Sequence, residues 1–230
     1  MPKHFPVSGE VHGLPRVVRL PATIGHCKIS STAFHNNHTA IPRSPAERLT
    51  IQDVAVYRCQ HWACSAHGVA FEHVTVTDIR GGGMATSFLW GCLFRHVVLR
   101  GWFGGVLFRW QVDHTDKVLS RRFLTANLAV YASIDWALDI SESSFSIYQS
   151  LLGVPAALVR RNSAKHFVLR RESAEKIVAQ TNAPSLWKIT AEELIKSDLS
   201  DTVVASGGAG KSLQAQLADA KALRDQGLLE

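Results

Sequence analysis

Four residues near the middle of the chain have the side chains that bind zinc. Cys59, His61, Cys64 and His67 offer two thiols and two imidazoles within a short segment, and these are the ligand types of structural zinc sites. Whether they can meet at one ion depends on the element that carries them, because the ligands of a metal must point to a common centre.

A second group combines one acid with two histidines. Asp53, His73 and His96 each follow an apolar residue by two positions, at equivalent places in three similar segments. We expect them to form a ladder on the surface. An acid beside two histidines could support acid–base chemistry or metal binding, and the alternative is a solvated corner with weak ion pairs. We expect the second, with no catalytic residue, cofactor or metal.

The charge of the chain is unevenly distributed. The stretch 172–230 holds six Lys/Arg and nine Asp/Glu, a net charge of −3, whereas residues 1–171 carry +9. A basic body attracts anionic partners such as nucleic acid, acidic protein or a phosphorylated ligand, and the alternative is an ordinary solvated face. The densest basic cluster, which we name as the expected partner-binding surface, comprises Arg121, Arg122, Arg160, Arg161, Lys165, Arg170 and Arg171.

Residues 206–212, Ser-Gly-Gly-Ala-Gly-Lys-Ser, resemble a phosphate-binding loop. Ala205 stands where that motif requires its first glycine. We therefore expect a plain connection between a strand and a helix.

Apolar residues in the first two thirds of the chain recur at intervals of five. The pattern restarts at Leu49, Val69 and Cys92 and places Trp102, among others, on the inward side. Neither a helix nor a simple alternating strand gives this period. Short strands with a corner every five residues do, and stacking such coils buries a common core.

The same register bears on the zinc question. All four cysteines fall on the inward first position of the step, in different places along the chain, so we expect them to be reduced, buried and free of metal and of disulfides. His61 falls on an inward position that favours Phe or Leu, where we expect a local distortion that lets Trp62 or the imidazole reach solvent, or else a hydrogen-bonded buried histidine. The cysteines are Cys27, Cys59, Cys64 and Cys92.

The five-residue step resembles the pentapeptide-repeat family, whose motif is a small residue, Asp or Asn, Leu or Phe, and two polar positions. The pieces that fit are Ala126-Asn127-Leu128, Leu138-Asp139-Ile140-Ser141-Glu142, Cys92-Leu93-Phe94-Arg95-His96 and Cys27-Lys28-Ile29-Ser30-Ser31. The resemblance implies a mainly β fold, a right-handed, four-sided parallel β-helix or solenoid of roughly 20 residues per coil. Some members of the family resemble duplex DNA and act on topoisomerases, a role that needs an acidic surface and is not expected of these basic repeats.

The domain organisation follows from where the register holds. We expect an N-terminal lead-in or cap over 1–21, a pentapeptide-like β-helix over 22–152, a basic strand or hairpin over 153–172, and an α-helical C-terminal segment over 173–230. Thr190 opens a capping box that predicts a helix start. The helical segment should cover the last coil, or else bind a partner.

The chain has no apolar segment that favours a membrane. Its longest uncharged stretches, 81–94 and 145–159, fall short of the roughly 18 residues that a span needs, and its first residues do not resemble a signal peptide. We therefore expect a cytoplasmic protein that does not interact with a membrane.

The residues predict binding rather than catalysis, because the repeats contain neither paired acids nor a complete nucleophile constellation. We expect a non-catalytic interaction protein whose partner is an acidic protein, as an inhibitor or immunity factor. One alternative is nucleic-acid binding through the basic face. Another is a small β-helix enzyme that acts on polysaccharide, with Asp53, Glu72 and Asp78 as the chief carboxylates.

Overall fold

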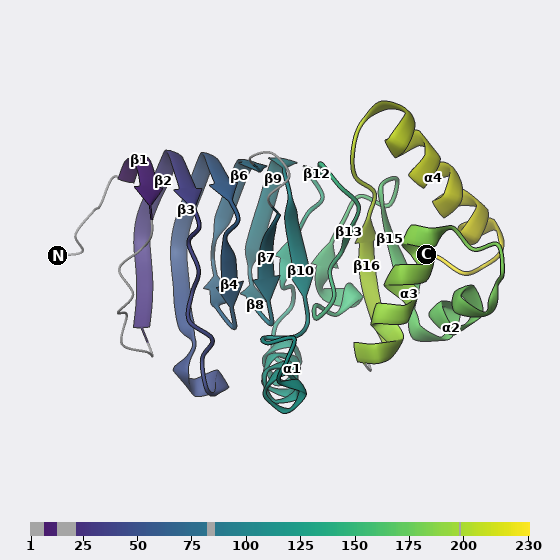
Figure 1. Cartoon of the computed structure of the whole chain (residues 1–230), viewed down its shortest axis with the longest axis horizontal. Helices are drawn as coiled ribbons and strands as arrows, with labels where there is room; N and C mark the ends of the chain where they lie inside the picture. The colour runs from purple at the N-terminus through teal and green to yellow at the C-terminus, as the bar shows by residue number, and fades with distance from the viewer. Residues whose placement is uncertain (1–6, 13–21, 82–85, 198) are drawn as a thin grey trace.

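The computed structural model describes residues 7–12, 22–81, 86–197 and 199–230. Its strands lie side by side along the long axis of the molecule, and helices lie at the C-terminal end of this row (Figure 1). The elements that carry possible binding side chains therefore succeed one another along this axis.

A ten-stranded parallel sheet makes up most of the body. Its main path is β1-β2-β3-β6-β9-β11-β14, and three short strands pair beside it. Parallel neighbours require the chain to return to the same end of the sheet before each new strand. The strands are β1 (Val7–His12), β2 (Ala22–His35), β3 (Leu49–Trp62), β5 (Ala70–Glu72), β6 (Thr75–Gly81), β8 (Leu93–Arg95), β9 (Val97–Phe103), β11 (Leu138–Asp139), β12 (Ser143–Phe145) and β14 (Val159–Arg160).

Single residues with left-handed backbone bend the sheet at matching places. His26, Asp53, His73 and His96 have φ between 52° and 56°, and the residues just before them pair across neighbouring strands. Among non-glycine residues, Asn, Asp and His adopt this conformation most readily. Because the bends lie next to one another, the sheet curls into a half-barrel.

Two smaller sheets complete the β structure. One is parallel, in the order β10-β7-β4, and the other is antiparallel, in the order β13-β16-β15. Their strands are β4 (Ser65–His67), β7 (Ser87–Trp90), β10 (Val106–Arg109), β13 (Gln149–Ser150), β15 (His166–Arg170) and β16 (Asp201–Ala205).

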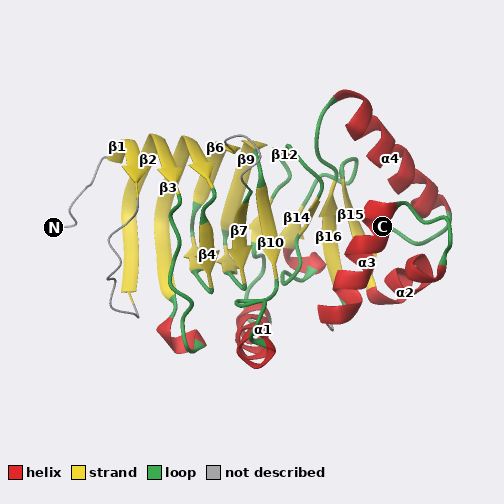
Figure 2. Ribbon diagram, viewed as in Figure 1, coloured by secondary structure: helices red, strands yellow, loops and turns green. Residues whose placement is uncertain are grey.

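The α-helices of the described residues lie outside the sheets, at one edge and at the C-terminal end (Figure 2). They are α1 (Lys117–Tyr131), α2 (Arg171–Ala179), α3 (Ser185–Ser197) and α4 (Gly210–Asp225). Asp116 caps α1 by accepting a hydrogen bond from the Leu119 N–H at 2.8 Å, which satisfies one of the free amides of the first turn. None of the described helices is long and apolar enough to cross a membrane.

Aromatic side chains form the centre of the main core. Phe71 and Phe94 lie in register on β5 and β8, and their rings stack with centroids 5.7 Å apart. Phe94 also contacts Phe108 of β10, at 5.7 Å, and Ile51 pairs with Phe71 across β3 and β5. The predicted alignment of Ile51, Phe71 and Phe94 is therefore confirmed. A second core, which includes Trp187, joins the C-terminal helices to the antiparallel sheet.

The predicted fold class, a four-sided pentapeptide-repeat solenoid, is wrong. The described residues form a mixed structure in which a curled parallel sheet forms a half-barrel beside four helices. The clearest miss is Ala126-Asn127-Leu128, which lies within α1. There the Asn127 side chain is buried and donates to the carbonyl oxygens of Gly91 and Cys92, both at 3.3 Å. A three-residue match to a repeat motif cannot distinguish a strand from an amphipathic helix.

Three local predictions also need correction. The strands on either side of Asn162 do not form a hairpin, because β14 pairs in parallel with β11 and β15 pairs with β16. Thr190 does not open a helix, since α3 begins at Ser185 and buries Thr190 in its interior. Within the predicted 1–21 lead-in, β1 pairs with β2. The rest of that lead-in, 1–6 and 13–21, lies outside the described residues.

Candidate functional site

The Cys and His residues near the middle of the chain have separate partners. Cys59 is fully buried against the carbonyl oxygens of its own and the neighbouring strand, whereas Cys64 is half-buried. His67 Nδ1 donates to the Val112 carbonyl at 2.9 Å. Nowhere in the described part of the chain do three or more His, Cys, Asp or Glu residues gather as a metal site would require.

Of the two arrangements expected for His61, the structure shows the hydrogen-bonded buried histidine and not the imidazole that reaches solvent. His61 is 5% exposed, with Nε2 donating to the Gly104 carbonyl at 2.5 Å and Nδ1 accepting from the Ser87 hydroxyl at 2.6 Å. The Ser87 oxygen in turn accepts from the Cys64 N–H at 3.0 Å. Burial lowers the pKa of His61 and favours this neutral form.

The three ladder residues do lie in one column, at the first bend of the sheet. The rings of His73 and His96 have centroids 5.0 Å apart. The acid that pairs with His96 is Asp135, at 2.8 Å, whereas Asp53 faces His26 at 3.5 Å. The hydrogen bond from His96 lowers the pKa of Asp135.

The basic cluster is divided between elements. Arg121 lies on α1, donates to the Ser197 carbonyl at 3.2 Å and lies over the Trp110 ring at 5.4 Å. Arg160 lies over the Trp136 ring at 4.3 Å. The set is distributed over α1 (Arg121, Arg122), β14 and the loop after it (Arg160, Arg161, Lys165), and the junction of β15 with α2 (Arg170, Arg171).

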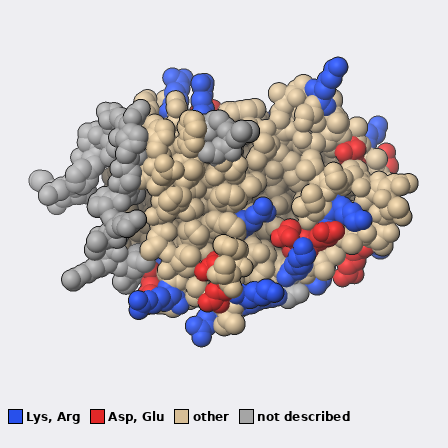
Figure 3. Space-filling view, in the orientation of Figure 1, with Lys and Arg blue, Asp and Glu red and all other residues tan. Residues whose placement is uncertain are grey.

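Much of this positive charge has partners inside the molecule. Arg170 pairs with Glu230, Arg171 lies 3.7 Å from Glu175, and Arg161 donates to a backbone carbonyl of β15 at 3.1 Å. Acidic and basic atoms alternate over the C-terminal part and the lower edge in Figure 3. These arginines therefore neutralise acids or brace the backbone, and the view shows no continuous basic face.

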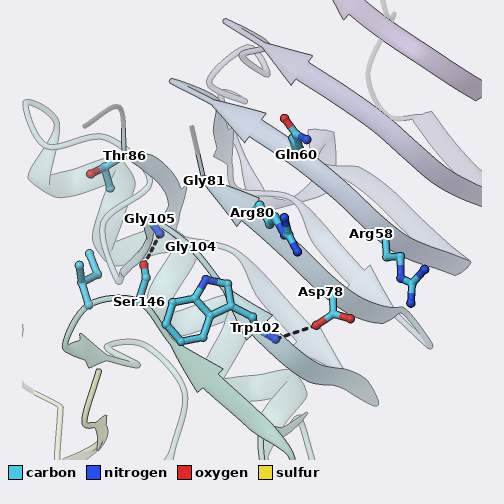
Figure 4. Close-up of a pocket in the computed structure, with 11 residues that line it drawn as sticks. Arg58, Gln60, Asp78, Arg80, Gly81, Thr86, Trp102, Gly104, Gly105 and Ser146 are labelled. Carbon is cyan, nitrogen blue, oxygen red and sulfur yellow. Dashed lines mark hydrogen bonds between the residues drawn. The ribbon is translucent and has the colours of Figure 1, made fainter. Parts of the chain in front are cut away.

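A polar groove lies elsewhere, on the outer face of the parallel sheet. It has a volume of about 1130 Å³ and crosses β3, β6 and β9 as far as the segment after β12. Arg58 and Asp78 lie at one end, Thr86 at the other, and Arg80 and Trp102 between them (Figure 4). The lining side chains are Arg58, Gln60, Asp78, Arg80, Thr86, Trp102, Ser146 and Ile147, with backbone from Gly81, Gly104 and Gly105.

A β-bulge turns the Trp102 indole into the groove. Thr77 of β6 pairs with Arg100, whereas Ile79 pairs with Phe103, so β9 has one extra residue at this point. As a result Phe103 is 4% exposed and Trp102 is 39% exposed. Bulges re-aim side chains in this way. The five-residue register had placed Trp102 inward, and the structure overturns that prediction.

Asp78 holds the bulge in place. Its Oδ1 accepts a hydrogen bond from the Trp102 N–H at 2.9 Å, which gives this backbone amide at the bulge a partner. Gly101, with φ of 75°, leaves room for this carboxylate, because a Cβ there would collide with Oδ1. Asp78 is therefore fixed in orientation, with its other oxygen available to the groove.

The floor of the groove is a close approach between two backbones. A Cβ on Gly81 would lie 2.8 Å from the Gly104 carbonyl oxygen, and one on Gly104 would lie 2.5 Å from the Gly81 nitrogen. On the interior side of the sheet, the buried His61 donates a hydrogen bond to the Gly104 carbonyl oxygen. Small residues and a braced backbone thus keep the floor flat and low.

Two arginines at the groove have no acidic partner among the residues that the structure describes. Arg58 and Arg80 are exposed, and within the described ranges neither guanidinium lies within ion-pair distance of a carboxylate. Arg58 lies over the Tyr57 ring at 4.8 Å. Such guanidinium groups can receive a carboxylate or phosphate with two parallel hydrogen bonds.

No family model, curated protein or solved structure matches this chain. The residues of the groove themselves indicate its chemistry. It combines two cationic groups, one carboxylate, one carboxamide, two hydroxyl groups and an indole face.

Sequence reasoning missed most of this site. The sequence indicates Asp78 only as one of few carboxylates in the repeats and does not single out Arg58 or Arg80. The sequence does contain one indication of the site. When the neighbouring strands are aligned, the outward polar residues Arg58, Asp78 and Arg80 lie close to a tryptophan. The bulge that exposes Trp102 has no local sequence signature apart from Gly101.

Proposed function

We propose that this protein is a non-catalytic binding protein that holds an anionic group of a macromolecular partner in the groove. The observation that supports this most is the pair of exposed arginines, Arg58 and Arg80, without an acidic partner among the described residues and beside the Trp102 indole. Unpaired guanidinium groups in a concave, polar site favour a ligand with carboxylate or phosphate groups.

Binding fits the groove better than hydrolysis. Cleavage of a glycosidic bond usually uses two carboxyl groups roughly 5–10 Å apart. Asp78 is the one carboxylate among the described lining residues, and its Oδ1 is engaged with the backbone of β9. The partner should therefore be bound and released unchanged.

The test compares two double variants that remove the same charge. Labelled oligoglutamate, oligoglucuronate and oligothymidylate serve as anionic probes, and fluorescence anisotropy gives their dissociation constants. Arg58→Gln with Arg80→Gln should weaken the tightest probe by at least about tenfold, since hydrogen bonds to charged groups contribute roughly 1.5–3 kcal/mol each. Arg95→Gln with Arg122→Gln removes two exposed arginines outside the groove and should change binding little.

Added salt should weaken binding of the tightest probe, because exposed charges are screened within about 8 Å at physiological ionic strength. Equal losses in the two double variants would show that only net charge matters and would refute the groove as the site. The proposal would also be wrong if none of the three probes bound, or if the bound probe were recovered in fragments.

A further inference from the structure

We infer that the anionic partner is an acidic oligosaccharide, a chain of sugar rings that bear carboxylates. This rests on the proposed function and adds the chemical class of the ligand. Three features of the groove point to it: an aromatic platform, a mixed set of donors and acceptors, and the direction in which the groove runs across the strands.

The aromatic platform is Trp102. The extra residue in β9 and the hydrogen bond from the Trp102 N–H to Asp78 place the indole at the surface, 39% exposed, instead of in the core. Exposing a large aromatic ring forgoes the stability that its burial would bring. A flat, apolar face suits the C–H face of a sugar ring, which is apolar although the rim of the ring is polar.

The polar groups match a ligand that both donates and accepts hydrogen bonds. The free oxygen of Asp78 can only accept, whereas Arg58 and Arg80 can only donate. Gln60 and the Thr86 hydroxyl can do both. A sugar acid supplies hydroxyl donors for the carboxylate and its own carboxylates for the arginines.

Other polyanions satisfy these groups less well. The side chains of an acidic peptide and the phosphates of a nucleic acid offer acceptors alone, so a donor for Asp78 would have to come from the peptide backbone or from a base, whereas every ring of a sugar acid carries hydroxyl donors beside its carboxylate. Like charges placed together disfavour binding. Asp78 thus disfavours a ligand whose charged groups come without hydroxyl donors, while the two arginines favour a ligand with negative charge.

The arrangement of the groove suits a chain rather than a single small anion. Arg58, Arg80 and Trp102 lie on three successive strands, β3, β6 and β9, which are spaced by roughly 4.8 Å. The groove continues past them to Ser146. A ligand that lies across the strands can therefore place one ring on the indole and extend its neighbours toward the arginines.

The test titrates four probes of matched length into the full chain: oligoglucuronate, an uncharged cello-oligosaccharide, oligoglutamate and oligothymidylate. We expect oligoglucuronate to bind at least about tenfold more tightly than each of the others. Trp102→Ala should weaken it by roughly tenfold or more, in line with the value of aromatic stacking. Trp62→Ala removes an indole that is 46% exposed outside the groove and should leave binding unchanged.

Trp102→Phe keeps an aromatic face and should retain part of the affinity. It keeps the test informative if Trp102→Ala fails to fold. Equal affinity for the uncharged oligosaccharide, or Trp102 variants that bind like the native protein, would overturn the inference. If oligoglutamate bound most tightly and Arg58→Gln with Arg80→Gln abolished that binding, the sugar class would be wrong while the proposed function stood. Failure of all four probes would remove both.

Discussion

His166 should make the protein lose stability in mild acid. The residue is 1% exposed, and burial, followed by the nearby charges of Lys165 and Arg161, lowers its pKa from 6.5 to about 4. Its Nδ1 accepts a hydrogen bond from the Asn162 N–H at 3.2 Å, which holds the neutral form. As the pH falls below 6.5 the unfolded chain takes up a proton at this position and the folded protein does not.

The size of the effect follows from the two pKa values. A fall from 6.5 to about 4 corresponds to a loss of about 3 kcal/mol in the free energy of unfolding. The contribution is fully present above pH 6.5 and disappears between pH 6.5 and pH 4. His61 and His67, whose pKa values are also lowered by burial, add to the loss in the same direction.

Urea unfolding followed by circular dichroism at several pH values between 8 and 4 measures this directly. His166→Asn keeps an acceptor near the Nδ1 position and removes the titrating group. Between pH 8 and pH 4, the free energy of unfolding of this variant should therefore fall by about 3 kcal/mol less than that of the native protein. His26→Asn is the control, because His26 is exposed and Asn tolerates its left-handed backbone. Parallel curves for the native protein and His166→Asn would refute the reasoning.

Three further predictions concern the core, a thiol and the bulge. Phe94→Ala should lower the free energy of unfolding by about 3–5 kcal/mol, because Phe94 is 5% exposed, whereas Phe71→Ala should cost about 2 kcal/mol, because Phe71 is only half-buried; equal losses in urea titrations would contradict the packing described. Cys92 should react with a thiol reagent far more slowly than Cys64 in the native protein at pH 8, since burial raises its pKa to about 12; peptide mapping that finds Cys92 labelled first would contradict this. Gly101→Ala should destabilise the protein by about 1 kcal/mol or more and change the Trp102 fluorescence, because the new Cβ displaces Asp78. Gly227→Ala is the control, because Gly227 also has a positive φ but open space around it. This control should change the stability of the protein without changing that fluorescence.

The apolar pattern predicted neighbours in space better than it predicted architecture. Ile51, Phe71 and Phe94 pair as aligned, because a fixed repeat of apolar residues determines which positions share a core. The same pattern assigned Ala126-Asn127-Leu128 to a β-helix coil, but these residues lie in the helix α1. Apolar spacing over a few residues is compatible with both elements, and Asp116 at the start of α1 was the signal that could have distinguished them.

The groove escaped prediction for a different reason. Its residues come from β3, β6 and β9, and they meet only because those strands pair side by side. The basic cluster, by contrast, was conspicuous in the sequence, yet Arg170 and Arg171 pair with acids of the C-terminal segment. Local charge density therefore did not indicate which arginines are free to bind.

The central claim is that Arg58 and Arg80 hold the carboxylates of the ligand. The most direct measurement is a titration of the full ¹⁵N-labelled chain with oligoglucuronate, following the arginine Nε–H signals by nuclear magnetic resonance and assigning two of them with Arg58→Gln and Arg80→Gln. We predict that these two signals shift together and saturate with one dissociation constant, while the signal of Arg122, exposed on α1, stays in place. Saturable binding in which the Arg122 signal moves and those of Arg58 and Arg80 do not would contradict the claim.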